Sequence, residues 1–276
     1  MLSKLLKYEF RATGRIMLPV YALLLVTAGG TSVTGSLLGR YPESTVLSIF
    51  RTLFMTLFAF TTFGVLLLTL VLMVYRFYKN LMTDEGYLMF TLPVSVDEHI
   101  FAKLIVSSVW FVVTWLVCML AFVLMFLCNL DMIEVNWSEI SYVMDQVWAK
   151  LLDFGLLHII GYILELLALI FAGCCFTCIQ FYSAMAIGYS FSNHKLLLSV
   201  VFFFVINVAL SILQPLLLAV TGNAGLLDFM ANSVQNISGP AAVHLVMLGA
   251  FLYALVFFVI LYIPTRLLLK HRLNLP

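Results

Sequence analysis

The sequence predicts an all-α polytopic membrane protein with six transmembrane helices. Of the 276 residues, 64% are hydrophobic and only 10% are charged, whereas soluble domains carry about 25% charged residues. Apolar runs long enough to cross a bilayer as helices, which requires about 20 residues, recur along the chain. Alternating segments of about ten residues, which are typical of transmembrane β-barrels, do not occur. We therefore expect the spans to be helical.

The apolar runs give the approximate positions of the spans and of a single transmembrane domain over 1–276. The predicted spans are 16–38, 47–75, 99–129, 154–188, 196–220 and 242–265. Several exceed the thickness of a bilayer, so we expect tilt or extension into water. The apolar run of the first span continues past any small-residue cleavage site, which favours an uncleaved membrane helix over a signal peptide.

The basic residues gather on one side of the predicted membrane. Three of the 14 lie on the opposite side, with most of the acidic residues of the connections. The other eleven are Lys4, Lys7, Arg11, Arg15, Arg76, Lys79, Lys103, Lys195, Arg266, Lys270 and Arg272. Because cytoplasmic connections are rich in Lys and Arg, this asymmetry predicts that both termini are cytoplasmic. The even number of spans agrees with that orientation.

The connection 76–98 on the basic side is the most informative segment. Its charged first part is followed by an apolar and aromatic insert, GYLMFTLP, which contains Tyr87, Leu88, Phe90 and Leu92. Apolar side chains surrounded by charges are typical of a docking surface, and a solvated loop with an interfacial turn is the alternative. After Pro93, the pattern Ser95–Glu98 predicts a capping box that starts the third span.

The N-terminal segment 1–14 predicts an amphipathic helix along the inner leaflet. Its apolar face holds Leu2, Leu5, Leu6 and Phe10, and its basic face holds Lys4, Lys7 and Arg11. Glu9 falls within the apolar face, where an unpaired carboxylate is costly. We expect Glu9 to pair with Arg76 or Lys103; a solvated Glu9 on a frayed helix is the alternative.

Polar residues inside the spans are a second group of candidates. Glu165 lies in the fourth span with His158 seven residues earlier on nearly the same face. The small residues beside Glu165 predict that this face contacts another helix, and they are Gly161, Ala168, Ala172 and Cys175. An interhelical hydrogen bond is the favoured role, and a proton relay or polar lining is the alternative.

Three other polar residues of the spans, Asn207, Gln214 and His244, are expected to have structural roles. Asn207 and Gln214 share a face of the fifth span and are expected to join helices. His244 is expected at the membrane interface, at the outer end of the last span. The outer segment 221–241 predicts a short interfacial or re-entrant helix.

The chain shows no sign of a cofactor of its own. It lacks the phosphate-binding pattern GxxxxGK[ST], so we expect no ATP binding of that type. The cluster Cys174, Cys175 and Cys178 is expected to pack in the helix core and not to hold a metal, because no His or second CxxC lies near it.

The segments LLKYEFRATGR, DEGYLMFTLPVS and AKL together resemble the permease subunits of bacterial ABC exporters, in particular the six-span, type-2 permeases of Gram-positive bacteria. The resemblance implies that 76–98 contains a coupling helix which seats in an ATPase subunit. The candidate coupling residues are Glu85, Gly86, Tyr87, Leu88, Phe90, Leu92, Pro93 and Lys103. It also implies that 1–14 is a cytoplasmic connecting helix, with Lys7, Glu9, Phe10 and Arg11 as its candidate residues. Ser190–Lys195 would be a smaller second contact.

The implied function is a non-enzymatic permease subunit in the bacterial plasma membrane that exports a hydrophobic or amphipathic substrate. Its partners would be membrane lipid, a second permease copy or paralogue, and a cytosolic ATPase that binds ATP and Mg; no nucleic acid is expected. The alternatives are an intramembrane enzyme or a stand-alone secondary transporter that uses Glu165 and His158. The chain lacks the paired carboxylates or HExxH helix of the former and recognisable repeats with broken helices of the latter.

Overall fold

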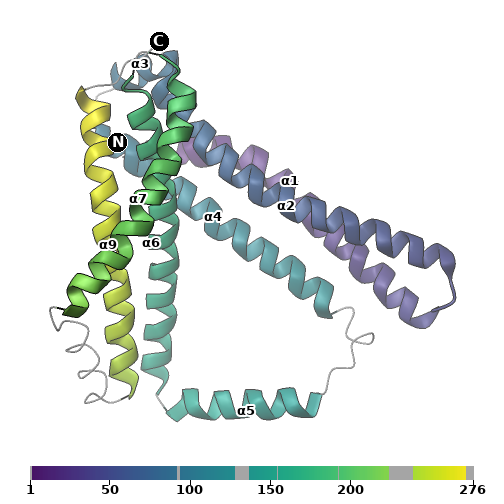
Figure 1. Cartoon of the computed structure of the whole chain (residues 1–276). Coiled ribbons are helices and arrows are strands. Elements are labelled where there is room, and N and C mark those ends of the chain that lie inside the picture. Colours follow the sequence, from purple (N-terminus) through teal and green to yellow (C-terminus); the bar gives the residue numbers. More distant parts are fainter. Residues whose placement is uncertain are drawn as a thin grey trace. The chain divides into compact units, whose positions relative to one another are not determined.

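The computed structural model describes residues 2–91, 94–127, 137–153, 155–191, 193–223 and 239–271. The regular structure in these ranges is helical (Figure 1). The helices are α1 (Leu2–Arg40), α2 (Thr45–Met82), α3 (Asp84–Thr91), α4 (Val96–Leu127), α5 (Trp137–Asp153), α6 (Leu156–Gly188), α7 (Lys195–Asn223) and α9 (Gly239–His271).

Six of these helices are long and apolar enough to cross a membrane: α1, α2, α4, α6, α7 and α9. The chain is therefore a multi-span membrane protein, as its composition predicts. The segment 1–14 differs in one respect from the expectation, because α1 runs without interruption from Leu2 to Arg40. From Leu2 onward, the predicted amphipathic helix and the first span are thus one helix.

The two shorter helices lie between spans. Helix α3 falls within the connection 76–98, where a coupling helix was expected. Helix α5 was not predicted, since the sequence analysis treated this region as a simple connection. Its signal was present: Ile140, Met144 and Val147 recur at helical spacing, and Glu139 and Asp145 lie away from them. At 17 residues, α5 is too short to be recognised as a span.

The chain forms two compact units. The α1 unit contains residues 2–73 and 109–146, and the α6 unit contains 74–108 and 147–276. Helices α2 and α4 contribute residues to both. The prediction of a single transmembrane domain stays a prediction.

The α1 unit is joined by hydrogen bonds between helices. The hydroxyl of Thr114 on α4 lies 2.6 Å from that of Tyr21 on α1 and 3.0 Å from that of Thr69 on α2. The indole nitrogen of Trp110 donates to the Thr13 hydroxyl at 2.7 Å. Such bonds join helices in a membrane, where apolar contact alone does not distinguish protein from lipid.

In the α6 unit, α7 and α9 pack against α6. Helices α6 and α9 run in the same direction and α7 runs in the opposite one (Figure 1). Gly188 at the end of α6 permits close approach, because a Cβ there would lie 2.5 Å from the backbone nitrogen of Ser199 on α7.

The ends of α2 and α4 that flank α3 are also fixed in this unit. The ring of Phe77 stacks on that of Tyr182 in α6 with centroids 3.9 Å apart, and the Tyr182 hydroxyl lies 2.8 Å from that of Ser107 on α4. Phe77, Leu81 and Met82 are fully buried. Helix α3 is therefore connected at both ends to packed helices.

Candidate functional site

Helix α3 presents polar and aromatic side chains on its exposed surface. Tyr87 is 54% exposed, and the Glu85 side chain is 47% exposed with Oε1 3.3 Å from the Nζ of Lys79. Asp84 and Glu85 occupy the first turn, where negative charge is favourable beside the positive end of the helix dipole. Gly86 is buried and donates its backbone N–H to the carbonyl of Thr83 at 2.7 Å. The exposed part of α3 thus contains a carboxylate and a phenol.

The remaining candidate coupling residues differ in their placement. The side chains of Leu88 and Phe90, and the whole of Leu92 and Pro93, lie outside the described residues. Lys103 departs from the expectation, because it lies in α4 and is only 5% exposed. It does not belong to the exposed surface. Its seven-residue distance from the start of α4 places it within the packed part of the helix.

The start of α4 is held by two sets of polar contacts. The predicted capping box is observed: the Glu98 N–H donates to the Ser95 hydroxyl and the Ser95 N–H donates to Glu98 Oε2, both at 3.2 Å. In addition, Asp97 Oδ1 accepts from the Arg266 Nε at 2.7 Å and from the Tyr262 hydroxyl. This link between α4 and α9 was not predicted, since its only signal in the sequence is a charge at the end of each span.

The turn between α6 and α7, predicted as a smaller contact, has an exposed and a buried part. Phe191 is 46% exposed. Tyr189 is buried with its ring centroid 5.9 Å from that of Tyr78 and 5.9 Å from the Nζ of Lys195. Burial, followed by the hydrogen bond with Tyr78, raises the pKa of Tyr189 above its ordinary value, so this phenol remains protonated.

The first turns of α1 show the amphipathic pattern that the sequence predicts. Lys7 and Arg11 are exposed, whereas Glu9 and Phe10 are half-buried. The Phe10 ring lies 6.4 Å from that of Trp110, measured between centroids. Pairing of Glu9 with Arg76 or Lys103 stays a prediction, because Glu9 belongs to the α1 unit and the two cations belong to the α6 unit.

The polar residues at the start of α6 form a hydrogen-bonded chain with α9. His158 Nδ1 lies 3.0 Å from His244 Nε2, and His244 Nδ1 lies 2.7 Å from Glu165 Oε1. The Tyr162 ring lies against His244, with centroids 4.5 Å apart. Gly161 provides the space for this histidine, because a Cβ at that position would lie 2.9 Å from His244 Cε1. This hydrogen-bonded chain therefore contains residues from two helices, α6 and α9.

The placement of His244 at the membrane interface stays a prediction, but its link to the two polar residues of α6 was not predicted. Its side chain is 28% exposed and bridges His158 and Glu165. Helical periodicity correctly places His158 and Glu165 on one face of α6. It gives no information on which helix meets that face, so the bridging residue could not be identified from the sequence.

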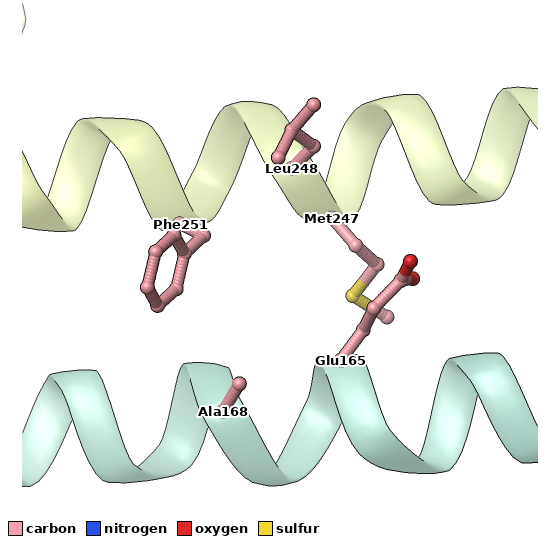
Figure 2. Close-up of a pocket in the computed structure, with 5 residues that line it drawn as sticks. All are labelled: Glu165, Ala168, Met247, Leu248 and Phe251. Carbon is pink, nitrogen blue, oxygen red and sulfur yellow. The ribbon is translucent and has the colours of Figure 1, made fainter.

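Glu165 also lines an apolar groove between α6 and α9. Figure 2 shows Glu165 and Ala168 on α6 opposite Met247, Leu248 and Phe251 on α9, around a cavity of about 190 Å³. A second cavity of about 320 Å³ shares Ala168 and Phe251 with the first. The small residues Ala168, Ala172 and Cys175 line the second cavity, so this face of α6 contacts α9, as their pattern suggested.

The two predicted polar residues of α7, Asn207 and Gln214, do not form a comparable cluster. The amide nitrogen of Asn207 donates to the carbonyl of Phe203 at 2.7 Å, a bond within α7 and not between helices. Gln214 is half-buried. Of the predicted outer segment 221–241, residues 224–238 lie outside the described ranges.

In the described part of the chain, no group of three or more His, Cys, Asp and Glu side chains is placed to hold a metal ion. No protein-family model, curated protein or solved structure matches this chain. The chain is thus a multi-span membrane protein with a short helix, α3, between its second and third spans. A hydrogen-bonded His–His–Glu link joins its fourth and sixth spans.

Proposed function

We propose that this chain is the permease subunit of an ATP-binding-cassette exporter. It would move a hydrophobic or amphipathic substrate with energy from ATP hydrolysed on a separate cytosolic subunit. The observation that carries the proposal is α3, a short helix with exposed Glu85 and Tyr87 between two spans. Its sequence, DEGYLMFT, is part of the motif on which the resemblance to these permeases rests.

The surroundings of α3 suit a coupling element. Only Thr83 separates α3 from α2, and the end of α2 is fixed by the stack of Phe77 on Tyr182. On the other side, Asp97 at the start of α4 is paired with Arg266 of α9. A displacement of α3 by a bound partner would therefore act on α2, α4 and α9, since packed helices move as rigid segments.

The distribution of basic residues supports a cytoplasmic location for α3. The basic asymmetry orients both termini and α3 toward the cytoplasm, where an ATPase would have access. A second permease copy or a paralogue would complete the transport path. On this proposal ATP and Mg are bound by the partner, and the chain is not itself an enzyme.

The test is recovery of the ATPase with affinity-tagged protein from its native membranes in mild detergent. Tyr87→Ala should lower the recovery of a co-purifying ATPase, identified by its phosphate-binding motif in mass spectrometry, by about tenfold or more, which corresponds to about 1.4 kcal/mol. Buried aromatic anchors contribute this much to protein interfaces. Tyr142→Ala on α5 is the matched control, because Tyr142 is 65% exposed and is predicted to lie on the opposite side of the membrane.

Glu85→Ala should also reduce recovery. This change also removes the contact between Glu85 and Lys79. The variant Lys79→Ala therefore shows how much of the lost recovery comes from that exposed ion pair, whose contribution to stability is expected to be less than about 1 kcal/mol. Equal recovery with the intact chain, Tyr87→Ala and Glu85→Ala would refute α3 as the docking element.

A second candidate function is a self-contained transporter linked to proton movement. The hydrogen-bonded chain of His158, His244 and Glu165 favours it, because ionisable groups inside a bundle commonly mark ion or proton pathways. Absence of any ATPase from the intact, folded protein would favour this candidate.

A further inference from the structure

The hydrogen-bonded chain of His158, His244 and Glu165 extends from the N-terminal end of α6 into the span. His158 lies near the start of α6, and Glu165 lies seven residues further on, a rise of about 10 Å along the helix axis. His244 on α9 bridges them with both of its ring nitrogens. The three groups thus form two consecutive hydrogen bonds that lead toward the apolar groove shown in Figure 2.

Two protonation states in which both imidazole rings are neutral satisfy both hydrogen bonds. When Glu165 is ionised, His158 Nδ1–H donates to His244 Nε2, and His244 Nδ1–H donates to Glu165 Oε1. When Glu165 carries a proton, its O–H donates to His244 Nδ1, and His244 Nε2–H donates to His158 Nδ1. Both rings are neutral in each state and exchange only their tautomers. The observed atom positions fit both directions.

The surroundings of Glu165 give the carboxylate a reason to take up a proton. Its second oxygen, Oε2, is buried and has no hydrogen-bond partner among the described residues. The adjoining groove is lined by Ala168, Met247, Leu248 and Phe251. An ionised oxygen in apolar surroundings without a partner is costly, whereas a protonated carboxyl is not charged.

Few other titratable groups lie near His158, His244 and Glu165. On α6 itself, the Tyr162 ring contacts both histidines. On α9, the next titratable side chain after His244 is Tyr253. On α7, the only titratable side chain is Lys195, which lies beside Tyr189 at the opposite end of α6. In the described part of these helices no Lys or Arg is in contact with Glu165.

We propose that His158, His244 and Glu165 form a proton-binding relay that ends in the groove between α6 and α9. One proton from water binds Nε2 of His158, the Nδ1 proton of His158 moves to Nε2 of His244, and the Nδ1 proton of His244 moves to Oε1 of Glu165. One proton is taken up, both imidazoles end neutral, and the carboxylate becomes a carboxylic acid. The inference does not depend on the proposed permease function.

The test follows the ring nitrogens of histidine by NMR in the full-length protein, labelled with ¹⁵N-histidine and reconstituted in lipid nanodiscs. The pH is lowered from about 8 to about 5, which is the range in which imidazole chemistry responds to pH. Over this range, His158 and His244 should both change from Nδ1–H to Nε2–H tautomers in a single coupled step. Rings that keep their tautomers throughout, or any ring that becomes doubly protonated, would overturn the relay in favour of a structural link.

Two variants distinguish a proton relay from a purely structural link between α6 and α9. Glu165→Gln keeps an oxygen that accepts from His244 Nδ1–H but cannot accept a proton in this range, so the tautomer exchange should be lost while both hydrogen bonds persist. Unchanged exchange in Glu165→Gln would also overturn the proposal. His194→Asn, which removes a histidine at the α6–α7 turn, is the control that should leave the exchange intact. If Glu165→Gln fails to fold, the titration of the unmodified protein still decides.

Discussion

Substitution of Gly188 by alanine should destabilise the α6 unit through a steric conflict between α6 and α7. A Cβ on Gly188 would lie 2.2 Å from the hydroxyl oxygen of Ser199, 2.5 Å from its backbone nitrogen and 2.6 Å from its Cα. Ordinary van der Waals contact begins at about 3.4 Å. The start of α7 must therefore move away from α6 by nearly 1 Å, because the nearest backbone atoms cannot rotate out of the way.

The magnitude follows from this displacement. Overpacking of a close contact costs about 1–3 kcal/mol, and the replacement of glycine by alanine inside an unobstructed helix is favourable by about 0.5–1 kcal/mol. Gly173 lies in the same helix and has nothing within 4 Å of its ideal Cβ. Both substitutions replace a glycine of α6, so this gain largely cancels and Gly188→Ala should be about 1–3 kcal/mol less stable than the matched control Gly173→Ala.

The assay is the free energy of unfolding of both variants by denaturant titration in the same mild detergent. The double variant Gly188→Ala with Ser199→Ala should recover only part of the loss, because the backbone nitrogen and Cα of Ser199 remain in place. Equal stability of Gly188→Ala and Gly173→Ala would refute the close approach of the two helices. Full recovery in the double variant would show that the hydroxyl alone was in conflict.

Three further predictions concern polar contacts. Glu165→Leu should lower the free energy of unfolding by about 1–3 kcal/mol because it leaves the His244 N–H without an acceptor, whereas Glu165→Gln should be tolerated; equal thermal stability of the two would exclude a structural hydrogen bond. A double-mutant cycle on Asp97→Ala and Arg266→Ala should give a coupling of about 0.2–1 kcal/mol, since both groups are partly exposed; a coupling of zero would mean that this pair does not join α4 to α9. Ser95→Ala should cost about 0.5–2 kcal/mol in unfolding free energy through loss of the α4 cap, and an unchanged value would show that the cap is dispensable.

Local signals in the sequence were sufficient for the spans and for the start of α4. Runs of apolar residues gave all six spans, and the pattern Ser95–Glu98 gave the start of α4 together with its cap. Both depend on neighbouring residues along one helix, so they can be identified without knowledge of its partners. Helix α5 was missed because an amphipathic helix of 17 residues has neither the length nor the uniform hydrophobicity of a span.

The candidate sites were predicted only in part. Periodicity placed Glu165 and His158 on one face, but it did not indicate that His244 joins them. Lys103 matched the motif of the coupling segment, yet its side chain is buried in α4. In both cases the sequence indicated the position of the residue along its own helix but not its surroundings in space.

A multi-span helical membrane protein can be recognised from the amino-acid sequence alone, because the length and hydrophobicity of a span are properties of one continuous segment. The faces that meet are visible only in the folded protein: His244 against Glu165, Gly188 against Ser199, and Asp97 against Arg266. This difference arises because lipid and protein interior are similarly apolar. A helix in a bilayer is therefore hydrophobic on all sides, and the contacts that choose its partners are a few small and polar residues whose counterparts lie far away in the chain.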